Sequence, residues 1–481
     1  MVTEERKLNL ALPGNPRYQP KSLQEIFGYD NLMLPVIEVE LAGMYVLAEV
    51  GIISSDEIAG LTPEVVQQIR AITTSQVDKR EREVTKHDIR ALVQLIQEQL
   101  PPNLKRWVHV GFTSYDPLET GRMIQFAWAH RAVISPKCKE VILILAKLVR
   151  KYAKTLQTGR THGQHAIPIT VGFWLATILN RILYNNMQAD SFARGLVGKI
   201  SGAVGASNAI IGLGVEERCK PFSFEARVLG RLGLKSAKIS TQILPPEPLA
   251  QYLFSSTLLS VAFAQFGRDC RNLMRSEIAE IGEPFAEGQV GSSTMAQKRN
   301  PITFENLEGM GQRNIAEFWK VMSSLVSEHQ RDLVGSSLAR DFPIILVNLV
   351  VQMENLLRQD KNGIAFLERL TVNEANCMRN FETAAPYSLA EPTYIALQMG
   401  GYTRDAHELV NRKAVPLSQS RENQPLMYSV RMLAEDDEEL SAALGNIPTE
   451  VIELLEHPES YIRNATAKAI EIAELAELYA T

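Results

Sequence analysis

Cysteine is scarce in this chain and is never grouped. The four cysteines among the 481 residues, Cys138, Cys219, Cys270 and Cys377, lie far apart, and none belongs to a Cys-x-x-Cys pair. This spacing excludes a zinc finger or ribbon. It is typical of single thiols buried in a protein of a reducing compartment.

Long apolar runs and a strong excess of one charge are also missing. The longest purely apolar runs, such as Val141–Ala146, fall far short of the roughly 20 residues that span a membrane. The charged start, Met1–Lys7, does not resemble a secretory signal. The formal net charge of −5 argues against a nucleic-acid-binding face, which is usually strongly basic. We therefore expect a cytoplasmic protein with neither a membrane nor a nucleic acid as partner.

Several motifs of catalysis and cofactor binding are absent from the sequence. It contains no Gly-x-Ser-x-Gly elbow and no His-Glu-x-x-His. His162 and His165 have no carboxylate or cysteine nearby in sequence that would complete a metal site, so we expect no metal. The glycines of Gly195–Ser201 and Gly202–Gly214 lack the spacing or the preceding strand of a nucleotide loop. They indicate a bend or close backbone packing.

Helical periodicity dominates the sequence. From Leu249 to Leu273 apolar side chains recur every three or four residues, which is typical of long helices packed at shallow angles. Similar long apolar segments are Val141–Leu156, Val171–Phe192 and Phe342–Leu357. With 45% hydrophobic residues the chain can bury a large core. We predict an all-α protein with a central bundle of long helices.

The two flanks of this bundle differ from it. Before about residue 112, a Pro- and Gly-rich arm precedes shorter helices such as Leu32–Val50 and one that Thr62 caps. After about residue 360, prolines and Gly400-Gly401 separate short segments, the acidic run Glu435–Glu439 starts a helix, and a last helix covers Glu459–Tyr479. The predicted domains are residues 1–112, 113–360 and 361–481, all helical.

One polar stretch of the central region, Gly288–Pro301, carries the strongest chemical signal. It combines two glycines, three hydroxyls, a lysine, an arginine and an asparagine in fourteen positions. Composition alone describes a flexible surface loop. The same residues also suit catalysis, because backbone N–H groups between small residues can face an anion while Lys298 and Asn300 hold a carboxylate. A serine in such a nest, Ser292, can act as a general base, because its alkoxide would be stabilised there.

This stretch resembles the signature of the fumarase/aspartase superfamily, Gly-Ser-Ser-x-Met-Pro-x-Lys-x-Asn-Pro, with Ala296 in place of the proline. Two further segments resemble the blocks that precede the signature in that superfamily, Gly111–Asp116 and Gly159–Pro168. We refer to these two as the first and second blocks and to Gly288–Pro301 as the third block. The resemblance covers nearly the whole chain and implies the superfamily's helical bundle.

Within the superfamily the chain resembles the adenylosuccinate lyases. The matching elements are Pro16–Tyr18, Lys86–Asp88, Gly198–Gly205 and Arg331-Asp332 with Ser336–Arg340. The arginines and serines of the last element suit a phosphate, although a salt-bridged helix cap uses the same residue types. The implied reaction splits adenylosuccinate into AMP and fumarate, together with the matching succinyl-carboxamide ribotide step of purine synthesis.

The resemblance also implies a role for each matched residue. Ser292 would remove the proton beside the substrate carboxylate, and His162 would protonate the departing nitrogen. The residues implied at the succinyl and base portions are Thr113, Ser114, Gln242, Ser293, Lys298, Asn300 and Asn306. Those implied at the rest of the nucleotide are Arg17, Tyr18, Lys86, His87, Asp88, Arg331, Ser336, Ser337 and Arg340. No cofactor is implied, and related enzymes are homotetramers whose active sites combine several subunits.

Three departures from the family pattern keep another substrate open. Ala296 removes a constraint on φ, Ile243–Pro248 follows Gln242 where the family has an arginine, and Arg463 stands where it has a glycine. The alternative within the class is a related lyase that releases fumarate from another N-succinyl or substituted-succinate compound. The alternative from another class is a catalytically silent helical binding protein. The presence of the base, the acid and the lysine together argues against a silent protein.

Overall fold

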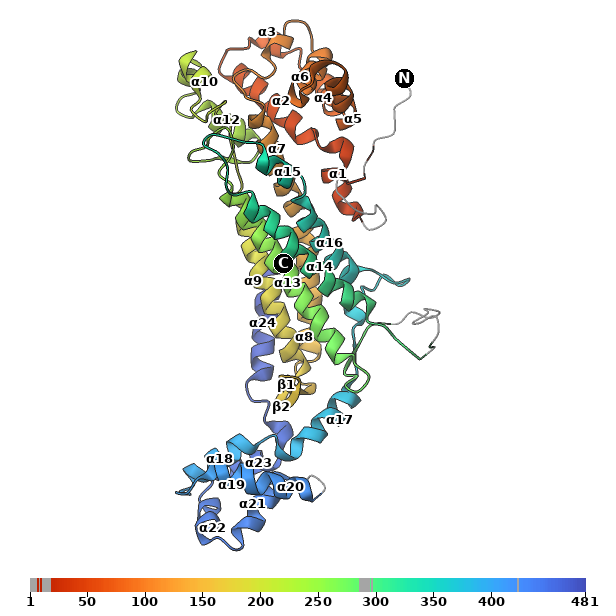
Figure 1. Ribbon diagram of the computed structural model, residues 1–481, viewed down its shortest axis with the longest axis vertical. Helices are drawn as coiled ribbons and strands as arrows, with labels where there is room; N and C mark the ends of the chain where they lie inside the picture. The colour runs from red at the N-terminus through yellow and green to blue at the C-terminus, as the bar shows by residue number, and fades with distance from the viewer. Residues whose placement is uncertain (1–6, 8, 11–18, 285–294, 296, 422–423) are drawn as a thin grey trace. The chain divides into compact units, whose positions relative to one another are not determined.

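The computed structural model describes residues 7, 9–10, 19–284, 295, 297–421 and 424–481, and helices dominate this part of the chain (Figure 1). The contacts divide the chain into two units, each assembled from three separate segments. Unit 1 comprises Met1–Cys138, Tyr184–Ala264 and Asn306–Asn355, and unit 2 comprises Lys139–Leu183, Gln265–Glu305 and Leu356–Thr481. The expected helical fold is confirmed, and the domain boundaries near residues 112 and 360 stay predictions.

Short helices and one long one make up the N-terminal part of unit 1. They are α1 (Gln24–Phe27), α2 (Leu34–Glu49), α3 (Ser55–Ile58), α4 (Pro63–Arg70), α5 (Thr74–Arg80) and α6 (Asp88–Gln99). The predicted cap is confirmed, because the Thr62 hydroxyl accepts the N–H of Val65 at 3.4 Å and proline opens the helix. The predicted helix Leu32–Val50 is α2, whose buried residues include Ile37, Val39 and Leu41.

Long helices form the central part of the chain. They are α7 (Tyr115–Ala129), α8 (Ser135–Lys151), α9 (Val171–Arg194), α13 (Glu247–Leu273), α14 (Ile302–Ser323) and α16 (Pro343–Leu357). The seam from Leu249 to Leu273 is one continuous helix. Its fully buried side chains include Tyr252, Leu259, Phe263, Phe266 and Cys270, so the three-to-four spacing predicted the buried face. The segment Val141–Leu156 is helical only as far as Lys151.

Strands are short and paired, and the longest pair is a hairpin. Strand β1 (Leu156–Thr161) pairs antiparallel with β2 (Gln164–Thr170), and the two-residue turn between them has positive φ at His162 and Gly163. Positive φ at both central residues is the type I′ geometry, which matches the twist of the flanking strands. The other pairs are β3 (Val197–Gly198) with β4 (Lys235–Ser236) and β5 (Ile281–Gly282) with β6 (Thr371–Val372).

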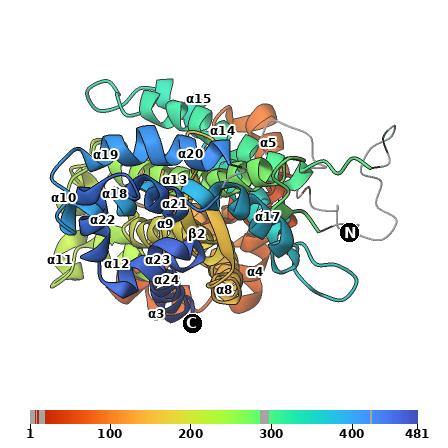
Figure 2. The ribbon, with the colours of Figure 1, turned by 90° about the horizontal axis from the view of Figure 1, so that it is seen from below.

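The remaining helices are shorter. Unit 1 also contains α10 (Asn208–Gly212), α11 (Val215–Cys219), α12 (Phe224–Arg231) and α15 (Val334–Ala339). Unit 2 also contains α17 (Glu374–Ala384), α18 (Ala390–Met399), α19 (Ala406–Leu409), α20 (Val415–Ser420), α21 (Leu426–Ala434), α22 (Glu438–Gly445), α23 (Thr449–Glu456) and α24 (Ala465–Ala480). Helices α18–α23 gather around a core of their own (Figure 2). The predicted acidic helix start is α22, capped by Asp437, and the last helix begins at Ala465, six residues later than predicted.

Among the described residues, three helical segments are long and apolar enough to cross a membrane by length and composition alone. They are Tyr29–Glu49, Glu247–Leu273 and Val334–Leu357. In the first two, 67% of the most apolar window is buried inside the protein, as in the core helices of a bundle.

Candidate active site

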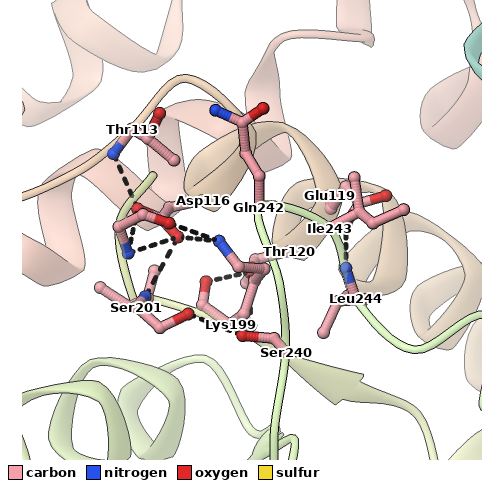
Figure 3. A network of polar contacts seen from close by, with 12 residues as sticks. Thr113, Asp116, Glu119, Thr120, Lys199, Ser201, Ser240, Gln242, Ile243 and Leu244 are labelled. Carbon is pink, nitrogen blue, oxygen red and sulfur yellow. Dashed lines mark hydrogen bonds and ion pairs between the residues drawn. The ribbon is translucent and has the colours of Figure 1, made fainter. Parts of the chain in front are cut away.

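The first block ends in a fully buried carboxylate that holds two loops (Figure 3). Asp116 accepts the N–H of Thr113 at 2.7 Å and the N–H groups of Ser201 and Gly202, each at 3.1 Å. The ammonium of Lys199 is its ion-pair partner, and neither side chain is exposed. Backbone donors and an ammonium together satisfy the carboxylate in the core. The backbone that carries Thr113 is therefore tied to the Gly202 loop.

That loop bends sharply at two glycines. Gly202 and Gly205 have φ values of +78° and +75°, and a Cβ on Gly205 would lie 2.1 Å from the Ser240 carbonyl oxygen. The hydroxyls of Ser201 and Ser240 are 2.8 Å apart. The prediction of a bend with close backbone packing is confirmed. Its result is that the segment leading to Gln242 lies against the Gly202 loop.

A cavity of about 640 Å³ lies in unit 1, and its size is typical of a site for a small ligand. The predicted site residues that line it are Lys86, His87, Asp88, Ser114, Arg331, Ser336 and Arg340. They come from three stretches far apart in the sequence. The structure thus brings most of the predicted nucleotide-side residues to one cavity.

The guanidinium of Arg331, one of the cations that line this cavity, is held by two side chains. Its guanidinium carbon lies 3.3 Å from the centroid of the Tyr115 ring, and its Nη1 donates to Gln242 Oε1 at 3.1 Å. The Tyr115 hydroxyl is in turn 2.5 Å from Ser336 Oγ. A guanidinium that stacks on an aromatic ring and donates a hydrogen bond has a defined orientation, which suits a planar fork that binds phosphate. Gln242 therefore joins the site through Arg331.

The stretch Lys86–Asp88 meets the first block at the start of α6. His87 caps this helix, since its Nδ1 accepts the N–H of Arg90, and its Nε2 lies 3.3 Å from Ser114 Oγ. Lys86 has a positive φ of 53°, so the chain turns immediately before the cap. The cap places His87 beside Ser114, and its neighbours Lys86 and Asp88 line the same cavity.

His162 occupies the exposed tip of the β1–β2 hairpin in unit 2. A fully buried carboxylate, Glu280, anchors this hairpin through its first strand. Arg160 donates to its two oxygens at 2.6 and 3.1 Å, Gln157 donates at 2.8 Å, and Asn380 donates at 2.9 Å. A bidentate pair that is also hydrogen-bonded on both sides restricts the hairpin. The anchor therefore fixes the backbone of His162 and leaves its ring accessible.

The third block lies mostly outside the described residues, and so do its predicted Ser292 and Ser293 and the departure Ala296. Arg17 and Tyr18 lie outside them as well. Of the described residues, Lys298 is exposed and Asn300 is half-buried. The chain is fixed on both sides of the block: Glu283 Oε1 accepts the N–H groups of Thr303 and Phe304 at 2.7 and 2.9 Å, at the start of α14. Burial raises the pKa of Glu283, although these hydrogen bonds oppose the rise.

Among the described residues of unit 1, four predicted site residues do not line this cavity: Thr113, Gln242, Asn306 and Ser337. Asn306 Oδ1 accepts a hydrogen bond from Asn355 at 2.8 Å, and Ser337 is exposed. The substrate contacts and catalytic roles of all the predicted site residues stay predictions.

The sequence is similar to known lyases over most of its length. A family model described as a lyase matches residues 32–315. The adenylosuccinate lyase of Pyrococcus horikoshii is 32% identical over 96% of this chain and 98% of its own. That of Bacillus subtilis is 30% identical over 89% and 93%.

The chain belongs to this lyase family. It is a carbon–nitrogen lyase of the fumarase/aspartase superfamily, as the three blocks imply. Solved structures show the same fold at lower identity. A 3-carboxy-cis,cis-muconate lactonizing enzyme from Pseudomonas putida has a TM-score of 0.78 at 22% identity and covers 96% of this chain and 98% of its own. A fumarate lyase from Mesorhizobium sp. BNC1 has a TM-score of 0.78 at 20% identity, over 96% and 100%.

One face of α7 in this lyase contributes cavity residues that sequence reasoning missed. Tyr115, Leu118, Arg122 and Phe126 follow one another at three or four residues and all line the cavity. The signal was available, because α7 starts directly after the predicted site residue Ser114 and its later turns present the same face. No local motif marks Arg122, and only the helical spacing points to it.

Proposed function

We propose that this lyase cleaves adenylosuccinate to AMP and fumarate, and that it acts likewise on the succinyl-carboxamide ribotide of purine synthesis. The observation that carries the proposal is the cavity in unit 1, in which Lys86, Arg331 and Arg340 gather around one space. Such a cationic cavity suits the phosphate of a nucleotide. The names of the relatives, which match over nearly the full length, support the same substrate.

The elimination needs a base, an acid and a site for a developing negative charge. In our proposal Ser292 takes the proton from the carbon beside the carboxylate. The negative charge left on that carbon is delocalised into the carboxylate, which becomes a dianionic aci-carboxylate. Lys298 and Asn300 stabilise that dianion. The electron pair then forms the double bond of fumarate, the carbon–nitrogen bond breaks, and His162 protonates the nitrogen. The exposed hairpin tip supports this role, because it leaves the imidazole free to approach a substrate.

The alternative substrates receive no support from the relatives. A lyase for another N-succinyl compound was suggested by Ile243–Pro248, which has no arginine. The relatives that match over most of the chain are adenylosuccinate lyases. We therefore keep adenylosuccinate as the substrate.

We also propose a cytoplasmic homotetramer with active sites shared between subunits and with neither nucleic acid nor membrane as partner. Exposed apolar side chains on the long helices support assembly. On α14, Ile315, Trp319 and Met322 are 50%, 70% and 47% exposed at helical spacing, and on α13 Phe254 and Leu258 are also exposed. Helices with such stripes pack against other helices, here those of further copies.

The decisive experiment is to incubate the purified protein with adenylosuccinate and to measure fumarate release. Ser292→Ala and His162→Ala should each lower kcat by about 10²-fold or more, because each removes a proton-transfer group. His457→Ala, which changes an exposed histidine of unit 2, is the matched control and should keep full activity. No release by the wild-type protein would refute the substrate. Undiminished release by both site variants would refute the assignment of base and acid.

A further inference from the structure

Arg122 stands in the wall between two cavities. It lines the cavity of about 640 Å³ together with Tyr115 and Ser336, and the same three residues line a smaller one of about 90 Å³. Tyr115 and Arg122 are seven residues apart on α7, so both side chains lie on one face of that helix. The ring beneath Arg331 and the guanidinium of Arg122 therefore belong to the same wall.

Arg122 is half-buried, and its guanidinium has no hydrogen-bond acceptor or ion-pair partner among the described residues. Glu119 is a carboxylate close enough for its pKa to be affected by the charge of Arg122. It accepts a hydrogen bond from the N–H of Leu244 at 2.5 Å and none from Arg122 (Figure 3). Burial raises the pKa of Glu119, and the charge of Arg122 opposes the rise without a direct contact. Removing a cation from water without a partner is costly. The donors of Arg122 are thus available to a ligand.

The charges around the larger cavity indicate what that ligand is. Its lining contains four fixed cations against two carboxylates: Lys86, Arg122, Arg331 and Arg340 against Glu81 and Asp88. The excess suits a group with two negative charges, such as a phosphate monoester. The predicted carboxylate-binding residues, Lys298 and Asn300, do not line this cavity.

The segment after Gln242 supports the same conclusion. Ile243–Pro248 contains no basic residue, and it lines the smaller cavity beside Arg122. At this wall the positive charge comes from α7 and not from the segment itself.

We propose that Arg122 is a substrate-binding residue whose guanidinium binds the phosphate of the nucleotide. It does so from α7, a part of the chain distant in sequence from the predicted element Arg331–Arg340, which lines the same cavity. The inference rests on the proposed function, since it takes the ligand to be a nucleotide monophosphate. It adds a contact that none of the family motifs contains, and it names Arg122 as a determinant of specificity for a phosphorylated substrate.

The test compares AMP and adenosine binding to the full-length protein by isothermal titration calorimetry. Arg122→Met should weaken AMP binding roughly 10- to 100-fold, the usual loss for one charge-assisted contact, and leave adenosine binding unchanged. Arg131→Met is the matched control, since Arg131 follows α7 and is exposed. Equal AMP affinity in both variants would overturn the proposal. Equal weakening of AMP and adenosine binding by Arg122→Met would also overturn the proposal.

A double variant distinguishes phosphate binding by Arg122 from a purely structural role of this residue. If Arg122 served only to offset Glu119, then Glu119→Gln combined with Arg122→Met would restore AMP binding, and our inference would be wrong. If Arg122 binds phosphate, the double variant stays as weak as the single one. Arg122→Lys, which keeps the charge but not the fork, should recover part of the affinity.

Inorganic phosphate separates this inference from the proposed function. At constant ionic strength, phosphate should raise the unfolding temperature of the wild-type protein and of Arg131→Met, but not that of Arg122→Met. If the wild-type protein fails to cleave adenylosuccinate while this pattern holds, the proposed substrate falls and the phosphate contact stands. If cleavage is normal and phosphate protects Arg122→Met as well, the contact falls and the substrate stands.

Discussion

The ion pair of Asp116 with Lys199 offers the sharpest test of how the first block is held. Both side chains have no exposed surface. Asp116→Asn would remove the countercharge of the Lys199 ammonium, whose other acceptor among the described residues is the neutral Gly202 carbonyl at 3.4 Å. It would also place an amide NH₂ beside backbone N–H groups that now donate to the carboxylate, such as that of Thr113.

The magnitude follows from what each variant leaves unpaired. Removing one partner of a buried ion pair costs about 3–5 kcal/mol, and Asp116→Asn should fall in this range. Lys199→Met should cost less, about 1–3 kcal/mol, because the remaining carboxylate keeps three backbone donors. The double variant should cost less than the sum of the two, since it leaves no unpaired charge in the core.

Urea denaturation followed by intrinsic fluorescence measures these differences, with an unchanged denaturant slope as the sign that the unfolding reaction is the same. The activity of each variant with adenylosuccinate shows whether Thr113 and Ser114 keep their places. The reasoning is refuted if Lys199→Met is the more damaging of the two single variants. It is equally refuted if the double variant costs their full sum.

Two further predictions concern single residues of unit 1. Burial lowers the pKa of His109, but the hydrogen bond and charge of the buried Glu40 outweigh burial, so the pKa lies above its ordinary 6.5. The pair stabilises the fold only while His109 is protonated, so the stability of the wild-type protein should fall as pH rises above about 6.5. Glu40→Gln should make this fall less steep. Melting-temperature curves of the two proteins that run parallel between pH 6 and 8.5 would contradict the pairing. Gly202→Ala should cost about 1–2 kcal/mol for positive φ alone, whereas Gly205→Ala should cost clearly more, because its Cβ would lie 2.1 Å from the Ser240 carbonyl oxygen. Equal urea midpoints for the two alanine variants would show that the close approach is unimportant.

The sequence predicted the long helices well, because a buried face at three-to-four spacing is a local pattern. The cap at Thr62 is local in the same way. The β1–β2 hairpin was missed because its strands are polar, with Gly159 in the first and Pro168 in the second, so they show no clear alternation. Its anchor is Glu280, which lies more than a hundred residues from the hairpin and follows no motif.

The site divides in the same manner. Lys86–Asp88 and Arg331–Arg340 were predicted from motifs, and the cavity brings them together. Tyr115 and Arg122 were not predicted, because their role depends on which face of α7 meets the cavity. That choice is set by packing across the unit, and no pattern of neighbouring residues states it.

Each of the three blocks has a buried carboxylate within it or close to it that accepts hydrogen bonds from the chain around it. Asp116 holds the first block, Glu280 the second through the hairpin, and Glu283 the start of the helix that follows the third. None of the three lines the cavity of unit 1. A buried carboxylate with several charge-assisted donors has a strong preference for one geometry, since every lost donor leaves an unsatisfied charge in the core. The residues proposed for catalysis can therefore stay polar and accessible, while carboxylates away from the cavity fix the backbone beside them.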